Sequence, residues 1–64
     1  MWTLELDNGR FYVFRESTGC TEALSAISLI GAYQEAVRFG YEMNDKEWIQ
    51  EGARKPIPLN MEVK

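Results

Sequence analysis

The chain has 64 residues, which is enough for one small domain and too few for two. Its net charge of −3 disfavours direct nucleic-acid binding, because proteins that bind nucleic acid carry basic surfaces that neutralise phosphates. One cysteine and no histidine exclude an internal disulfide and a structural zinc site of the usual kind.

The first fifteen residues predict a β-hairpin with a two-residue turn at Asn8-Gly9. This pair favours the positive φ angles of a type I′ turn, whose length fixes the register of the two strands. Leu4 then lies opposite Val13, and Glu5 lies opposite Tyr12. Side chains alternate across a sheet, so the register sorts the hairpin into two faces.

The first face of the predicted hairpin is a core face: Trp2, Leu4, Leu6, Phe11 and Val13. The second face is mostly polar: Thr3, Glu5, Asp7, Arg10, Tyr12 and Phe14. Two aromatic rings, Tyr12 and Phe14, lie on this polar face without a role in the core. They are the sharpest candidates for a binding surface.

A long helix is predicted from Thr21, a suitable N-cap, to about Phe39, with Gly40 as the terminating residue. Its apolar positions follow helical spacing: Ala23, Ala26, Ile27, Ile30, Tyr33 and Val37, with Tyr41 as a candidate continuation. Gly31 either lets this helix pack closely on the sheet or breaks it into two shorter helices.

A second, short helix is predicted over residues 45–51, because Asn44 is a good N-cap and Glu47 completes a capping box. The final segment, Lys55 to Lys64, alternates apolar and polar residues and predicts a third strand. Pro58 cannot donate a hydrogen bond to a neighbouring strand, so this strand should lie at an edge.

These elements predict an α+β domain over residues 1–64, with the element order ββααβ. The sheet is expected to be three-stranded and antiparallel in the order 2-1-3, with the long helix on one face. The predicted core is Trp2, Leu4, Leu6, Phe11, Val13, Ile27, Ile30, Tyr33, Val37, Leu59 and Met61.

The sequence predicts no catalytic residue, no cofactor and no metal site. Without histidine there is no general base that titrates near neutral pH, and the serines have no such partner. Cys20 would be nucleophilic only near a helix N-terminus, and an incidental loop cysteine is the simpler interpretation. The protein is therefore expected not to be an enzyme.

Four acidic residues within ten positions form a second candidate surface: Glu42, Asp45, Glu47 and Glu51. Such a group can meet a basic partner, or it can be the solvated face of a capped helix. The two rings, Tyr12 and Phe14, have three interpretations: burial under the second helix, a protein interface, or a platform for nucleic-acid bases.

The hairpin sequence from Leu4 to Val13 resembles the opening of GIY-YIG nuclease domains. There a strand, an asparagine-glycine turn and a second strand come first. The stretch from Glu47 to Ile49, followed by residues 55–59, resembles a tryptophan and Lys-Pro-Ile stretch of some members. The resemblance covers the two ends of the chain and implies a ββαβ arrangement, in which Tyr12 matches the tyrosine of the second motif.

Other residues depart from the GIY-YIG pattern. Phe14 replaces the glycine of the second motif, and no tyrosine stands near residues 2–4 for the first motif. The helix arginine is absent, since Leu24 to Ile27 stand at its place, and no later metal-binding glutamate follows. The resemblance therefore implies a scaffold without the family's catalytic residues.

The leading hypothesis is a non-catalytic protein-binding module, with a partner that has a basic surface. Its size and acidity are typical of phage-encoded or mobile-element proteins that inhibit a host enzyme or a nucleic-acid-binding complex, which is an analogy of size class. No apolar run spans a bilayer and no secretory signal is present, which predicts a cytoplasmic protein without membrane contact.

Two alternative functions stay open at this point. A degenerate GIY-YIG-type nucleic-acid-processing domain would nick DNA with magnesium and lose this activity in Tyr12→Phe. A structural homodimer would use the edge strand or the aromatic rings as its interface.

Overall fold

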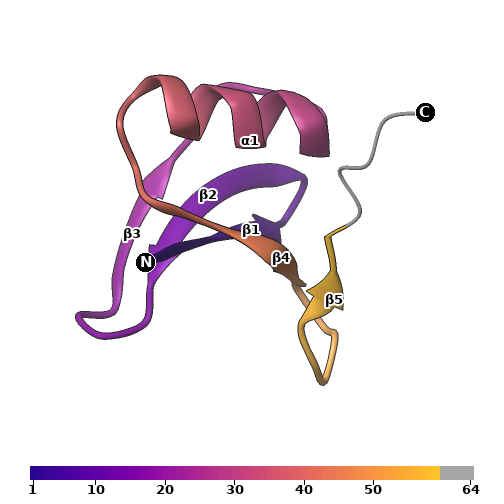
Figure 1. Cartoon of the computed structure of the whole chain (residues 1–64). Helices are drawn as coiled ribbons and strands as arrows, with labels where there is room; N and C mark the ends of the chain where they lie inside the picture. Colours follow the sequence, from indigo (N-terminus) through magenta and orange to yellow (C-terminus); the bar gives the residue numbers. More distant parts are fainter. Residues whose placement is uncertain (60–64) are drawn as a thin grey trace.

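A computed structural model describes residues 1–59 of the chain. In chain order its elements are β1 (Trp2–Asp7), β2 (Arg10–Arg15), β3 (Cys20–Ala23), α1 (Leu29–Arg38), β4 (Met43–Gln50) and β5 (Ile57–Pro58) (Figure 1).

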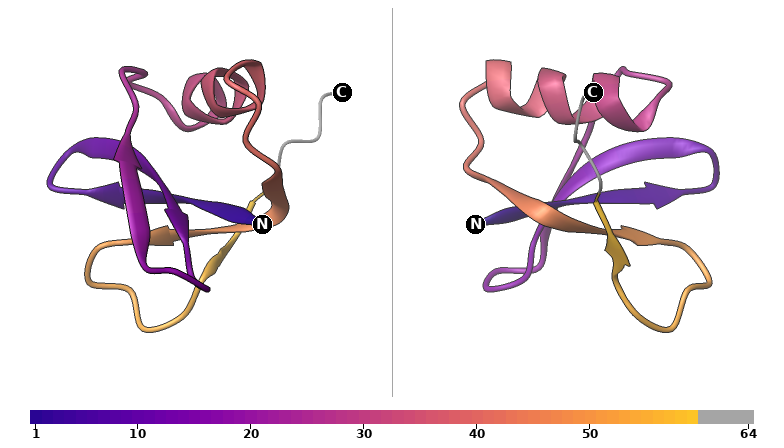
Figure 2. Two further views of the ribbon diagram at one scale, coloured as in Figure 1. Left: turned by 90° about the vertical axis from the view of Figure 1, so that its left-hand side faces the viewer. Right: turned by 45° about the vertical axis from the view of Figure 1, so that its right-hand side comes forward.

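The strands form one mixed sheet in the order β3-β2-β1-β4-β5. β4 lies parallel to β1, and every other neighbouring pair is antiparallel. α1 lies across one side of this sheet (Figures 1 and 2). The predicted three-stranded antiparallel sheet in the order 2-1-3, with two helices and the element order ββααβ, is therefore wrong. The broader prediction of an α+β domain agrees with these elements.

The predicted hairpin is confirmed. Leu4 pairs with Val13, and Glu5 pairs with Tyr12, in the expected register. Asn8 and Gly9 have φ angles of 54° and 80°, as a type I′ turn requires at both central positions. The turn chemistry alone determines this register, because a two-residue loop leaves the strands no freedom to slide.

The predicted start of the long helix at Thr21 is wrong, because Cys20–Ala23 forms β3 and pairs with β2. Gly19 has a φ of 75°, and its N–H donates to the Arg15 carbonyl at 2.7 Å, which closes the turn between β2 and β3. Extending the hairpin gives the backbone of this segment hydrogen-bond partners that are already in place, so β pairing overrides the helical periodicity.

The helix α1 begins after Ser28, whose Oγ accepts a hydrogen bond from the Gly31 N–H at 3.1 Å. A Cβ at Gly31 would lie 2.9 Å from that Oγ, so the glycine makes room for the cap and does not break α1. The predicted stop at Gly40 is confirmed by its φ of 94°. Gly40 N donates to Val37 O, and Tyr41 N donates to Ala36 O, which is a Schellman motif.

The predicted second helix over residues 45–51 is wrong, because Met43–Gln50 forms β4 beside β1. Asn44 caps no helix. Its Oδ1 accepts from the Lys46 N–H at 2.8 Å, within an irregular stretch where the register with β1 shifts. Trp48 pairs with the fully buried Leu4, so strand pairing packs Trp48 against the core.

The predicted third strand is confirmed only in part. Ile57–Pro58 forms the short edge strand β5, but it pairs with β4 and not with the first strand. Pro58 lies at the edge, as expected from its missing N–H. The predicted strand continues to Lys64, and its residues 60–64, including Met61 and Val63, lie outside the described part of the chain.

The core lies between α1 and the sheet: Leu4, Phe11, Val13, Leu24, Ala32 and Ala36. Leu59 is also buried. Three residues predicted for this core are exposed, with exposed fractions of 95% for Ile27, 51% for Ile30 and 50% for Val37.

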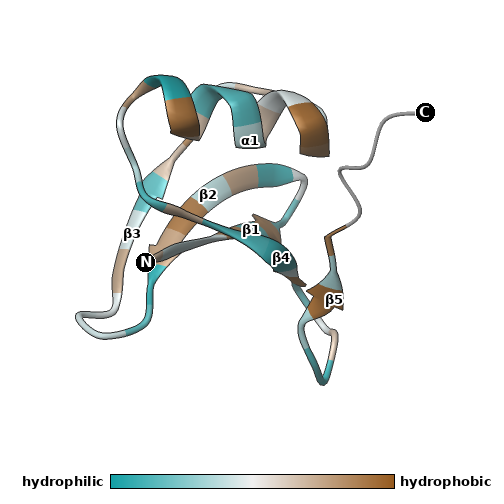
Figure 3. Cartoon of the chain, viewed as in Figure 1, coloured by the Kyte–Doolittle hydropathy of each residue, from teal (hydrophilic) through white to brown (hydrophobic). Residues whose placement is uncertain are grey.

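Small side chains explain this difference in the core. Ala32 and Ala36 are fully buried and allow α1 to approach the sheet closely. The larger β-branched residues of the helix are left on its outer flank, and hydrophobic residues stand near both ends of α1 (Figure 3). Helical spacing identified the apolar residues of α1 but not which of them face the sheet.

Candidate functional site

The side of the sheet that faces away from α1 is the candidate site, and we call it the open face. Within residues 1–59 the only helix, α1, packs on the opposite side. Register and alternation place the following strand residues on the open face: Thr3, Glu5, Asp7, Arg10, Tyr12, Phe14, Thr21, Ala23, Glu47 and Ile49.

The two predicted rings, Tyr12 and Phe14, share the open face. Both are half-buried by their neighbours on the sheet. The second helix that could have covered them is absent from the described residues, since that segment is β4. Burial under a helix, one of the three interpretations of these rings, is thereby excluded for residues 1–59.

A carboxylate lies in the middle of the apolar part of the open face. Glu5 pairs with Tyr12 on β2 and with Ile49 on β4, so it sits between an aromatic ring and an aliphatic side chain. Ala23 extends the same row beyond Tyr12. Glu5, Tyr12 and Ile49 are all half-buried, so this carboxylate is partly screened from water by its neighbours.

A second row of the open face surrounds Phe14 with small side chains. Thr3 lies opposite Phe14 on β1, and Thr21 lies opposite it on β3. Both threonines are smaller than the ring, and Phe14 is half-buried between them.

The four predicted acidic residues are all exposed, but they do not form one compact patch. The Glu42 carbonyl accepts from the Trp2 N–H, whereas the Glu51 N–H donates to the Leu6 carbonyl. These two residues thus lie at opposite ends of β1, about 13 Å apart at the usual rise of a strand. Asp45 lies between them, in the irregular part of β4.

Strand geometry instead brings part of the acidic group onto the open face. Glu47 pairs with Pro58 and shares its side of β4 with Ile49. With Glu5 and Asp7, it gives this face three carboxylates from strands, against the single guanidinium of Arg10 among the described strand residues. The open face is therefore both aromatic and acidic.

One further carboxyl, that of Glu51, meets Asp7 at the end of the hairpin. Glu51 Oε1 accepts a hydrogen bond from the Asn8 N–H at 3.0 Å. The Glu51 side chain also raises the pKa of Asp7 above its ordinary value, first through a shared hydrogen bond and then through its negative charge. Negative charge accordingly continues along the open face past the end of β1.

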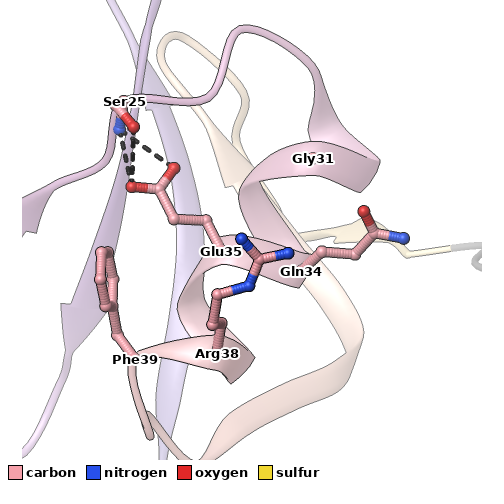
Figure 4. A pocket seen from close by; sticks show the side chains of 6 residues that line it. All are labelled: Ser25, Gly31, Gln34, Glu35, Arg38 and Phe39. Carbon is pink, nitrogen blue, oxygen red and sulfur yellow. Dashed lines mark hydrogen bonds between the residues drawn. The ribbon is translucent and has the colours of Figure 1, made fainter.

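A small hollow of about 300 Å³ lies on the other side of the molecule, against α1 (Figure 4). Its lining residues are Ser25, Gly31, Gln34, Glu35, Arg38 and Phe39. Glu35 accepts hydrogen bonds from Ser25 N, Ser25 Oγ and Ala26 N, at 2.8 to 3.1 Å. These bonds lower the pKa of Glu35, the Ser25 N–H being the largest cause. The carboxylate is thus occupied in holding the loop before α1.

Sequence reasoning missed two residues of the open face for different reasons. The predicted hairpin register already placed Glu5 beside Tyr12, but nothing in the sequence distinguished Glu5 from the other polar residues of that face as a site residue. No sequence pattern pointed to Ile49 as a site residue, because its segment was predicted to be a helix. Its place beside Glu5 depends on the parallel pairing of β1 and β4.

Other kinds of site find little support in the described residues. No three acidic, histidine or cysteine side chains come together there to hold a metal ion. Cys20 is exposed at the start of β3, whereas the helix α1 begins after Ser28. The helix α1 falls short of the length and apolarity that a membrane crossing requires.

Comparisons with known proteins add no family to these observations. No protein-family model matches the sequence, and neither a curated protein nor a solved structure matches it. The resemblance to GIY-YIG domains therefore stays a prediction from short motifs.

Proposed function

We propose that this protein is a non-catalytic protein-binding module that uses its open face to bind a basic protein surface. The observation that carries the proposal is the row Tyr12–Glu5–Ile49, in which a carboxylate lies between an aromatic and an aliphatic side chain. Aromatic residues with partly desolvated charges beside them are typical of the centres of protein interfaces.

A lysine or arginine side chain of a partner has the chemistry that this row recognises. Its apolar stem would cover Ile49, its charged head would pair with Glu5, and the Tyr12 ring would add a cation–π interaction. The neighbouring carboxylates of Asp7 and Glu47 favour approach of a positive surface. The same carboxylates repel the negative phosphates of a nucleic acid, so the proposed partner is a protein and not a nucleic acid.

An inhibitory role, which the small size and acidity of the chain suggest, is compatible with the charge of the open face. A row of carboxylates offers a basic nucleic-acid-binding surface the same charge as the phosphates that it normally contacts. A cytoplasmic location is part of this proposal. Glu42 and Asp45, which the sequence predicted as contact residues, lie away from the row and are left out of the proposed surface.

Affinity capture from a bacterial lysate tests the proposal when it is done with matched variants. Tyr12→Ala and Phe14→Asp alter the open face, whereas Ile30→Ala and Val37→Ala alter exposed apolar residues of α1. We expect a partner that is retained by the α1 variants and lost with the open-face variants, because removing a central ring costs about tenfold or more in affinity.

Circular dichroism on each variant verifies that it is folded. Capture that survives both open-face variants, or that fails only with the α1 variants, would contradict the proposed function. Light scattering on the pure protein separates a binding module from a homodimer that buries its own open face.

A further inference from the structure

The two edges of the sheet are formed by β3 and β5, and they differ in how they are protected. β5 has two residues, one of which is Pro58, and Pro56 precedes it. Prolines lack an N–H, and very short strands offer few backbone groups, so β5 is a poor template for another strand. β3 has four residues, all exposed, and contains no proline and no lysine.

The backbone of β3 presents unpaired groups to solvent. Leu24, directly after β3, donates its N–H to the Phe11 carbonyl at 2.8 Å and so faces β2. Because backbone groups alternate along an antiparallel strand, Glu22 also faces β2, while the N–H and C=O groups of Thr21 and Ala23 point outward. Within residues 1–59 no strand pairs with this outer edge (Figure 2).

The outer edge of β3 is continuous with the open face. The side chains of Thr21 and Ala23 lie on that face, beside Phe14 and Tyr12 respectively. Both are small, so larger side chains of an added strand could lean across them toward the two rings. Diagonal neighbours on adjacent strands lie within reach of aromatic and long side chains.

We propose that β3 accepts an extended segment of a basic partner protein as a sixth strand of the sheet. Main-chain hydrogen bonds to Thr21 and Ala23 would hold the segment. Those of its side chains that lie on the open face would contact Phe14 and Tyr12. The basic character of the partner rests in part on the proposed function, in which the open face binds a positive surface, and in part on Glu22, which pairs with Val13 and so lies on the α1 side of β3.

The charge of Glu22 favours a basic partner over a second copy of this chain. In a symmetric antiparallel pair of β3 strands that uses both outward residues, Thr21 pairs with Ala23 and the two Glu22 side chains lie directly opposite each other. Like charges in directly opposed positions destabilise a sheet, whereas a lysine or arginine opposite Glu22 stabilises it.

Nuclear magnetic resonance on the whole chain, labelled with ¹⁵N, tests the inference. The probe is a short blocked peptide in which lysine alternates with valine, and its control has glutamate in place of lysine. At a peptide concentration about ten times its Kd, we expect solvent exchange of the Thr21 and Ala23 amides to slow about tenfold. The glutamate peptide should leave both exchange rates unchanged.

The variant Ala23→Pro removes one outward N–H and leaves the pairing with β2 intact, so we expect a folded protein that no longer binds the probe. If this variant does not fold, a probe that is N-methylated on its pairing edge is used instead; it cannot donate hydrogen bonds to the outward carbonyls of Thr21 and Ala23, and it should not bind. Three results would overturn the inference: no slowing of either amide, equal binding of both peptides, or slowing that rises with protein concentration when no peptide is present.

The two proposals fail in different ways. If the lysine peptide leaves β3 unprotected but lysate capture still depends on Tyr12, strand addition is wrong and the proposed function stands. If substitutions of Tyr12 and Phe14 do not change capture, while the peptide still slows exchange of the Thr21 and Ala23 amides, then β3 binds the segment without a contribution from the open face.

Discussion

Glu35 holds Ser25 through two kinds of donor: both carboxylate oxygens accept from the Ser25 N–H at 3.1 Å, and Oε2 also accepts from the Ser25 hydroxyl at 2.9 Å. The loop that leads from the sheet edge to α1 is thereby fastened to the helix that follows it. This contact explains why residues 24–28 can leave the sheet without secondary structure of their own.

The Glu35 contact predicts an acid-sensitive part of the stability. The pKa of Glu35 is lowered in the folded protein, so its stabilising contribution is fully present above the ordinary value of 4.5. It is lost as the pH falls through the lower folded pKa. We expect Glu35→Gln to lower the free energy of unfolding at pH 7, with a difference from wild type that shrinks in acid.

Urea unfolding at a series of pH values measures this difference. Glu42→Gln is the matched control, because it makes the same chemical change at an exposed residue. A Glu35→Gln variant as stable as wild type at pH 7 would contradict the assigned role of Glu35.

Asp7 should behave in the opposite way. Its folded pKa is raised by Glu51, so the ionised pair destabilises the folded state at neutral pH. This penalty is relieved as the pH falls below the raised pKa toward the ordinary value of 3.8. Asp7→Asn should therefore increase the midpoint of urea unfolding at pH 7, and Asp45→Asn, at an exposed residue in the irregular part of β4, serves as the comparison. A lower midpoint for Asp7→Asn than for wild type would refute the unfavourable pairing.

The N-cap of α1 gives a prediction with a magnitude. Ser28→Ala removes the oxygen that accepts from the Gly31 N–H, and should lower the free energy of unfolding by about 1 kcal/mol. Ser17→Ala, in the exposed β2–β3 turn, should change it by less than about 0.5 kcal/mol. Equal effects of the two substitutions would argue against a helix that begins at Leu29.

The close packing of α1 on the sheet is tested by changing side-chain size. Ala36→Leu adds volume at a fully buried position and should destabilise the protein by about 1–3 kcal/mol. Ile30→Ala removes a larger side chain at a position that is 51% exposed, and should cost less than Ala36→Leu. If thermal unfolding showed that Ile30→Ala destabilises the protein more than Ala36→Leu does, Ile30 would have to be part of the core.

The open face gives a binding prediction that separates charge from shape. Glu5→Gln keeps the shape of the side chain and removes its charge, and should weaken partner binding by about tenfold at low salt. Glu42→Gln makes the same change at the Trp2 end of β1 and should have a smaller effect. Titrations of the captured partner with the two variants, each at two salt concentrations, measure these effects. If Glu5→Gln bound the partner as tightly as wild type, the row Tyr12–Glu5–Ile49 would not recognise a cation.

Part of the site could be predicted from the sequence because it depends on one turn. Asn8 and Gly9 favour a type I′ turn by their own backbone preferences, and that turn sets the register that puts Tyr12 and Phe14 on one face. The rest of the site depends on β4. Ile49 joins Tyr12 and Glu5 only through parallel pairing between segments far apart in the chain, which leaves no local pattern.

By itself the sequence therefore determined the hairpin, the end of the helix at Gly40 and the edge position of Pro58, because each follows from the backbone preferences of one or two residues. Only the tertiary structure decided that residues 20–23 and 43–50 are strands and that Ala32 and Ala36, rather than Ile30 and Val37, face the sheet. In these segments local helical signals compete with hydrogen bonds and packing to distant residues, and the distant contacts have the lower free energy.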